Sequence, residues 1–329
     1  MQITRRKFVI AAGAAGCVTL TGAAGAQPAY PNRPVRIVAP HPAGGGVDIT
    51  ARKLGEQMQS MLGQPFVVDN KPGANGMVGA QAVATSAADG YTLMVAGPGE
   101  IAIAPHLYKS MAYDPFKDLQ PITLCSRAPN VLVVGPKTAA TSVAEIIAHA
   151  KANPGAMSFG SSGIGNIQHL NGELFNMLAG VKIVHVPYKG AAPQLADIVG
   201  GQIEMGYASV AAALPLIRAG KVRAIAVTSR DRVPALPSVP TLSESPALAV
   251  YELNNWFGLF APAGVPAAVL ETVSSSARKA LSTPEMQKFI VDGGAAPAPQ
   301  SPDEFRTFLH GESTKFSRIV REVNITADG

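Results

Sequence analysis

Two glycine-rich stretches of the sequence have the residue types and spacing of anion-binding turns. The first, PHPAGGGVD at 40–48, follows an apolar run and precedes residues with helical spacing. The second, SSGIGNIQH at 161–169, repeats this arrangement and adds hydroxyl groups. A glycine turn between a strand and a helix exposes backbone N–H groups, and these donors and the helix dipole favour an anion. The pair predicts one ligand with an anionic group at each end, although either turn alone could be only a tight connection.

Catalytic and metal-binding patterns are not found around these turns. Ser161 and Ser162 do not satisfy G-x-S-x-G, because the flanking glycines lie at other offsets. The six histidines show neither H-x-x-x-H nor H-E-x-x-H spacing. His41 and His169 each lie in a turn, but a lone histidine is more often a hydrogen-bonded structural residue, and Lys189 in PYKG is interpreted as a solvated cap. We therefore predict no catalytic residue, no metal and no cofactor.

A third motif, GPGEIA at 97–102, matches the dinucleotide-binding pattern G-x-G-x-x-A and follows the apolar run YTLMVA. Its context argues against this function. Pro105 should interrupt the helix that the motif requires, and no strand ending in an acidic residue follows about 20 residues on. An exported nucleotide-dependent enzyme is kept only as an alternative.

Strands and helices alternate along the chain in two units, which predicts an α/β fold with parallel strands. The first unit has strands at 35–39, 66–69 and 91–96 and helices at 48–62 and 76–87. Apolar, β-branched runs over 119–135 are interrupted by Pro129. The second unit has strands at 157–160, 183–186, 205–208 and 223–227 and helices from 142 and at 167–178, 192–200 and 210–219. A proline-rich connection over 231–248 precedes a strand at 256–261 and helices at 266–282, 284–292 and 302–322.

Residues 1–26 have the pattern of an export signal. TRRKF resembles the twin-arginine signal, an apolar run follows, and Ala24-Gly25-Ala26 fits an A-x-A cleavage site. Cleavage after Ala26 removes three basic residues and no acidic one, so the formal charge of +5 becomes +2. This near-neutral charge gives no electrostatic reason to bind nucleic acid. An N-terminal membrane anchor and lipidation at Cys17 are alternatives; the mature chain would keep only Cys125 and form no internal disulfide.

Eight motifs, in this order, resemble those of the Bug receptors, the extracytoplasmic solute-binding proteins of tripartite tricarboxylate transporters. They are PHPAGGGVD, DNKPGANGMVGA, ADGYTLMVAG, YDPFKDLQP, FGSSGIGNIQHLNGELF, VPYKGAAPQLADIVGGQIEM, LPSVPTLSES and WFGLFAPAGVP. The resemblance implies a periplasmic binding protein with two α/β lobes, a cleft between them and two hinge crossings, as in type II binding proteins. The crossings would lie near 125–130 and 248–256, with lobe 1 at 27–127 plus 252–329 and lobe 2 at 128–251.

The resemblance also implies a function. A non-enzymatic, monomeric receptor would capture a small carboxylate, which could be a dicarboxylate, an amino acid or an aromatic acid. It would deliver this ligand to membrane transporter subunits or to a signalling partner; a sensory protein without transport is the alternative. Closure around the ligand would be a hinge motion. Backbone amides, hydroxyls and water, rather than arginine, typically hold the carboxylates in this family.

Carried onto this chain, the resemblance implies ligand contacts from both lobes. Those from lobe 1 are His41, Ala43, Gly44, Gly45, Asp48, Gly97, Pro98 and Gly99, with Asp48 interpreted equally as a helix cap. Those from lobe 2 are Ser161, Ser162, Gly163, Asn166, His169, Ala208 and Ser209. Two departures bear on the ligand: His41 stands where the family usually has an aromatic residue, and Ala104 stands where we expect Asn. We therefore expect His41 to add a polar or protonatable contact.

Overall fold

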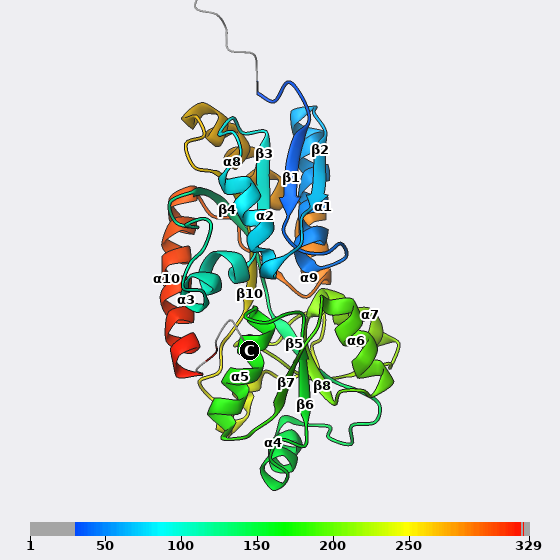
Figure 1. Cartoon of the computed structure of the whole chain (residues 1–329). Helices are drawn as coiled ribbons and strands as arrows, with labels where there is room; N and C mark the ends of the chain where they lie inside the picture. Colours follow the sequence, from blue (N-terminus) through cyan, green and yellow to red (C-terminus); the bar gives the residue numbers. More distant parts are fainter. Residues whose placement is uncertain (1–29, 324, 326–329) are drawn as a thin grey trace, which may run out of the picture.

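The computed structural model describes residues 30–323 and 325, and its strands form two separate mixed sheets (Figure 1). The first sheet has the order β11-β4-β10-β3-β1-β2 and the second the order β7-β6-β8-β5-β9. The predicted export signal lies outside the described residues. No helix of the described chain combines the length and the apolar character that a membrane span needs.

The first sheet is assembled from both ends of the chain. Its strands are β1 (Val35–Ala39), β2 (Phe66–Asn70), β3 (Thr92–Ala96), β4 (Leu119–Ala128), β10 (Asn255–Pro262) and β11 (Ala296–Pro297). The predicted parallel arrangement is found for β1, which pairs with both β2 and β3. Strand β10 lies antiparallel between β3 and β4, so the sheet is mixed rather than purely parallel.

Helices cover both faces of this sheet. They are α1 (Gly46–Leu62), α2 (Met77–Ala84), α3 (Ala104–Leu107), α8 (Ala267–Leu281), α9 (Pro284–Asp292) and α10 (Pro302–Glu322). Ile37 packs in a cluster with residues of α1, α8 and α9, whereas Val38 packs in a cluster with residues of α2 and α10. Successive side chains of a strand point to opposite faces, so a strand covered on both sides is apolar throughout.

The second sheet is built from the middle of the chain. Its strands are β5 (Asn130–Val134), β6 (Ser158–Ser161), β7 (Val184–Pro187), β8 (Met205–Ser209) and β9 (Arg223–Val227). Its helices are α4 (Val143–Ala152), α5 (Ile167–Ala179), α6 (Ala191–Gly200) and α7 (Val210–Arg218). Strand β6 runs parallel to β7 and β8, while β5 runs antiparallel to β8 and β9.

Two connections join the sheets, and they are hydrogen-bonded to each other. Only Pro129 separates β4 from β5, whereas residues 228–254, with short 3-10 turns at Leu242–Glu244 and Pro246–Leu248, separate β9 from β10. The backbone N–H of Asn130 donates to Thr228 Oγ1 at 2.9 Å, and the N–H of Thr228 donates to the Asn130 carbonyl at 3.0 Å. The lobe boundaries implied by the resemblance stay a prediction.

The expectation that Pro105 interrupts the helix after GPGEIA is wrong. Residues Gly99–Ile103 form a π-helical turn that continues directly into α3, so Pro105 does not interrupt the helical segment. Proline occupies the first turn of α3, where its missing N–H and fixed φ cost little.

Candidate functional site

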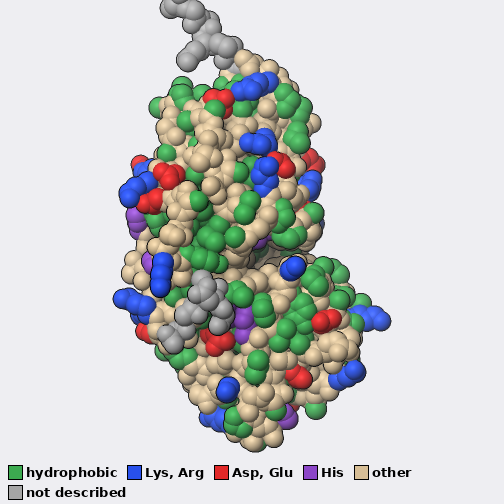
Figure 2. Space-filling model, viewed as in Figure 1, with side chains coloured by type: hydrophobic (Ala, Val, Ile, Leu, Met, Phe, Trp, Pro, Cys, Tyr) green, Lys and Arg blue, Asp and Glu red, His purple; other side chains and the backbone are tan. Residues whose placement is uncertain are grey.

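A cavity of about 250 Å³ lies between the two sheets and is lined from both. In the space-filling view a hollow separates the upper and lower parts of the molecule, and basic and acidic side chains are interspersed on the face shown (Figure 2). Helical segments of the described chain begin at the cavity wall: α1, the π-helical turn at Gly99, α5, α6 and α7. Because the N-terminus of a helix carries positive potential, this wall favours an anion.

Three of these helix starts lack a side-chain cap: those of α1, the π-helical turn at Gly99 and α6. Gly45 precedes α1 and Gly190 precedes α6, and neither helix receives a side-chain cap hydrogen bond. By contrast, Asn166 caps α5 and Ser209 caps α7. A Cβ placed on Gly190 would lie 3.8 Å from Cγ of Pro42, so the turns before α1 and α6 approach each other from opposite sheets. Their unpaired N–H groups can therefore donate to one ligand held between them.

Asp48 holds the first turn in shape from behind the cavity wall. Its Oδ2 accepts the Gly44 N–H at 2.9 Å, and its Oδ1 accepts from Asn70 Nδ2 at 2.9 Å and lies 2.9 Å from Arg52 Nη2. Burial opposes the charged form of Asp48, but the hydrogen bonds from Arg52, Gly44 and Asn70 outweigh it and lower the pKa of Asp48. The ionised carboxylate fixes Gly44, whose φ of +81° suits glycine.

His41 and Glu100 form an ion pair in the cavity wall. His41 Nε2 lies 3.2 Å from Glu100 Oε2, and Glu100 Oε1 accepts the Gly97 N–H at 2.9 Å. Burial disfavours the charged imidazole, but the charge of Glu100 and the hydrogen bond to it outweigh burial and raise the pKa of His41. Both oxygens of the fully buried Glu100 carboxylate are thus engaged, and its charge favours the protonated form of His41.

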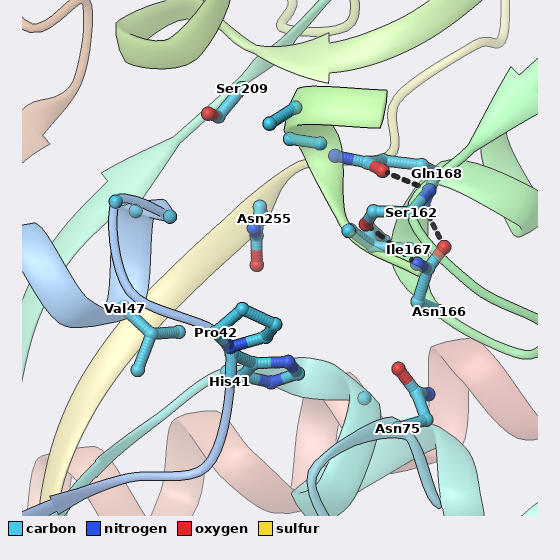
Figure 3. A pocket seen from close by; sticks show the side chains of 18 of the residues that line it. His41, Pro42, Val47, Asn75, Ser162, Asn166, Ile167, Gln168, Ser209 and Asn255 are labelled. Carbon is cyan, nitrogen blue, oxygen red and sulfur yellow. Dashed lines mark hydrogen bonds between the residues drawn. The ribbon is translucent and has the colours of Figure 1, made fainter. Parts of the chain in front are cut away.

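The second turn is held by side chains of the first turn of α5. Asn166 Oδ1 accepts the N–H groups of Gln168 and His169, both at 3.0 Å, and Asn166 Nδ2 donates to Ser162 Oγ at 2.9 Å. The Ser162 N–H donates to Gln168 Oε1 at 2.8 Å. Figure 3 shows Ser162, Asn166 and Gln168 together on one side of the cavity, joined by these bonds.

A serine–histidine pair lies behind this turn. Ser161 Oγ is 2.7 Å from His185 Nε2 and also donates to the Gly163 carbonyl at 2.8 Å. The rings of His169 and His185 stack with their centroids 3.7 Å apart. Burial lowers the pKa of His169 to about 4, and burial together with His169 lowers the pKa of His185 to about 3. Ser161 is fully buried and does not line the cavity, so this pair has no access to a ligand there.

The structure places ten of the fifteen expected contact residues on the cavity wall: His41, Ala43, Gly44, Gly45, Gly97, Pro98, Gly99, Ser162, Asn166 and Ser209. The other five, Asp48, Ser161, Gly163, His169 and Ala208, do not line it. Gly163 and His169 support the second turn, since Gly163 accepts from Ser161 and His169 Nδ1 accepts the Gly165 N–H at 3.1 Å.

Sequence reasoning missed a third glycine turn and several single residues. Lys189 and Gly190, between β7 and α6, follow the same strand–glycine–helix pattern as the first two turns, so that signal could have found them. Lys189 is the one Lys or Arg that the described part of the wall contains. The other missed residues are Pro42, Gly46, Val47, Asn75, Glu100, Ile167, Gln168, Ala191, Ala192, Pro193, Asn255 and Phe257.

The described residues offer no group of three or more His, Cys, Asp or Glu side chains placed to hold a metal ion. The donors on the cavity wall are instead backbone N–H groups, amides, the hydroxyls of Ser162 and Ser209 and the ammonium of Lys189, which suit an organic anion.

Comparison with known proteins identifies the family. A family model described as the tripartite tricarboxylate transporter family receptor matches residues 50–325. Among solved structures, the periplasmic binding protein BugD is 32% identical, with 90% of this chain and 99% of that chain covered and a TM-score of 0.84.

Two further solved structures carry ligands. An R. palustris protein solved with adipate is 34% identical, with 90% of this chain and 99% of that chain covered and a TM-score of 0.87. MatC from Rhodopseudomonas palustris, solved with bound malate, is 29% identical, with 88% and 100% covered and a TM-score of 0.82. The resemblance to the Bug receptors is thereby confirmed: the chain belongs to the tripartite tricarboxylate transporter receptor family of periplasmic solute-binding proteins.

Proposed function

We propose that this protein is a non-enzymatic periplasmic receptor that captures a small carboxylate between two lobes. One observation carries the proposal: the uncapped N-termini of α1 and α6 meet at one cavity from opposite sheets. A carboxylate bridging them satisfies N–H groups that no side chain caps. Each helix end contributes only about 0.3–1 kcal/mol through its dipole, so direct hydrogen bonds and enclosure must supply most of the affinity.

The charges around the cavity support an anionic ligand. Lys189 lines the wall, and its ammonium forms no ion pair within the described chain. The raised pKa of His41 extends the pH range in which its imidazole is positively charged, and when protonated it balances the charge of Glu100. The ligand is a dicarboxylate, an amino acid or an aromatic acid; adipate and malate, held by two proteins of the same fold and family, belong to the first class.

The two sheets belong to two lobes that close on the ligand by a hinge motion. Lobe 1 would span 27–127 plus 252–329, and lobe 2 would span 128–251. The short link at Pro129 and the hydrogen-bonded pair Asn130–Thr228 lie where the chain passes between the sheets, which suits a hinge. The loaded receptor delivers its ligand to transporter subunits, the role that the family description gives, after export by the signal at 1–26 and cleavage after Ala26.

Mass spectrometry of molecules that co-purify with the mature protein, followed by calorimetric titration with organic acids, tests the function. We expect one small carboxylate at close to one molecule per chain, and a rise in melting temperature when that acid is added. A bound dinucleotide, or no binding of any acid tested, would contradict the proposal. Pull-down from membranes with loaded and empty receptor separates a transporter from a signalling partner.

A further inference from the structure

Asn75 is a cavity residue whose side-chain amide has an unused donor. It lies in the short 3-10 turn Ala74–Gly76 between β2 and α2, and it lines the cavity. Among the described residues, its Nδ2 atom is buried and has no hydrogen-bond partner. In this orientation Nδ2 lies against Gly99 and does not reach the cavity. A buried donor without an acceptor destabilises a fold, so we expect the amide to turn its NH2 group to the cavity, where an acceptor can meet it.

The backbone of the turn that carries this amide has a strained conformation. Gly73, Ala74, Asn75 and Gly76 have φ values of +143°, +44°, +51° and +91°, a region that residues with a Cβ rarely adopt. The N–H of Gly76 donates to the Gly73 carbonyl at 2.9 Å, which closes the turn. Strain of this kind persists where the surrounding structure imposes it, and it gathers at binding sites.

Neighbouring residues fix where the turn sits against the cavity. A Cβ on Gly76 would lie 3.0 Å from the Glu100 carboxyl and 3.1 Å from His41 Nε2, so the turn packs directly on that ion pair. A Cβ on Gly99 would lie 3.1 Å from Asn75 Nδ2, so the amide lies over the GPG loop. The turn is therefore seated on the wall of lobe 1.

Asn75 stands at the end of the cavity away from α1. Figure 3 shows Val47, in the first turn of α1, on one side of the cavity, and Asn75 on the other, on the side of Asn166. A ligand whose first carboxylate binds the uncapped N-terminus of α1 would therefore present its far end to Asn75. The oxygen and nitrogen of an amide exchange places by a half-turn, which brings the NH2 group to the cavity without moving other atoms.

We propose that Asn75 is a specificity-determining residue whose amide donates to the distal acidic group of the ligand. It favours acids with a second carboxylate over acids of the same length that end in a methyl group. This inference rests on the proposed function, because it assumes that a carboxylate occupies the cavity.

The test compares Asn75→Gly with the matched variant Ala74→Gly. Glycine tolerates positive φ, so both variants relieve strain and should keep or raise the melting temperature, but only Asn75→Gly removes a cavity side chain. Calorimetry measures binding of adipate against hexanoate and of malate against 3-hydroxybutyrate. We expect Asn75→Gly to lose about tenfold or more in affinity for the diacid while its affinity for the monoacid is unchanged. Ala74→Gly should bind the diacid and the monoacid with the same affinities as the wild type.

The outcomes separate the two proposals. A wild type that binds a diacid as weakly as its monoacid, or an Asn75→Gly variant that keeps the diacid preference, overturns this inference and leaves the receptor function intact. Equal losses in Asn75→Gly and Ala74→Gly assign the effect to the turn's backbone and also overturn it. A wild type that binds no carboxylate at all overturns the proposed function and, with it, this inference.

Discussion

At the residue scale, the His41–Glu100 pair makes ligand binding depend on pH. The pKa of His41 is raised, so its positive charge persists above the ordinary value of about 6.5 and is lost only as the pH rises through the higher folded-state value. The affinity for an anionic ligand should therefore fall as the pH rises through that value. His41→Phe should remove this pH dependence and weaken binding at pH 6, as measured by calorimetry between pH 6 and pH 9.

The control for this prediction is His149→Gln, because His149 is exposed on α4, outside the cavity. It should leave the pH profile of binding unchanged. If His41→Phe keeps both the ligand choice and the pH profile of the wild type, His41 makes no protonatable contact with the ligand, and the expectation drawn from the sequence is wrong.

The stacked histidines His169 and His185 make the fold sensitive to acid. Their folded-state pKa values, about 4 and about 3, lie below the unfolded value of about 6.5. Below pH 6.5 the unfolded chain binds more protons, so the free energy of unfolding should fall as the pH drops from 6.5 towards 4. His185→Gln should flatten this dependence by about 2 kcal/mol, after allowance for solvent screening. Urea titrations at several pH values measure it, and an unchanged slope would contradict the assignment.

At the element scale, the start of α1 depends on close packing against β10. A Cβ on Gly46 would lie 2.5 Å from Cζ of Phe257, whereas a Cβ on Gly45 would meet only the Pro42 carbonyl, at 3.5 Å. Gly46→Ala should therefore reduce the free energy of unfolding by about 1–3 kcal/mol, because the helix or the ring must shift. Gly45→Ala is the matched control and should change stability by less than about 0.5 kcal/mol. Equal effects in urea denaturation would mean that the contact with Phe257 does not position the helix.

Elements with local signals were predictable from the sequence. The apolar run of β1, the glycine turn at 44–46 and the end of α1 at Gly63 were found within two residues, since each depends on residues adjacent in the chain. The antiparallel insertion of β10 was not, because strand pairing over more than 150 residues leaves no local pattern. Asn255 and Phe257 reach the cavity only through that insertion, and Asn75 only through the backbone of its turn.

At the scale of the whole molecule, the two halves share one apolar cluster on one side and approach each other again at the cavity. This apolar cluster continues from residues of α2 and α10 into α4 and α5, on the side of the molecule where the end of α10 reaches α5 (Figure 1). On the cavity side the halves meet through smaller contacts, such as Pro42 with Gly190. We therefore expect the two halves to separate on the cavity side when the molecule opens. The continuous apolar cluster should stay packed and lie near the hinge.

Leu107 provides a test of this motion. A Cβ on Gly165 would lie 2.5 Å from Cδ1 of Leu107, so this side chain of α3 rests directly on the turn before α5. Leu107 packs at the edge of the continuous cluster, and we expect its contact with the turn before α5 to be lost on opening. Leu107→Ala should therefore populate the open form, and the smaller closed fraction should weaken the apparent affinity about two- to tenfold. Small-angle scattering should then record a larger ligand-induced decrease in the radius of gyration than for the wild type.

Met177→Ala, which truncates an exposed apolar side chain of α5, is the control and should change neither the affinity nor the scattering difference. An affinity loss in Leu107→Ala without a change in the scattering difference would place Leu107 in a static contact and argue against closure across this part of the molecule.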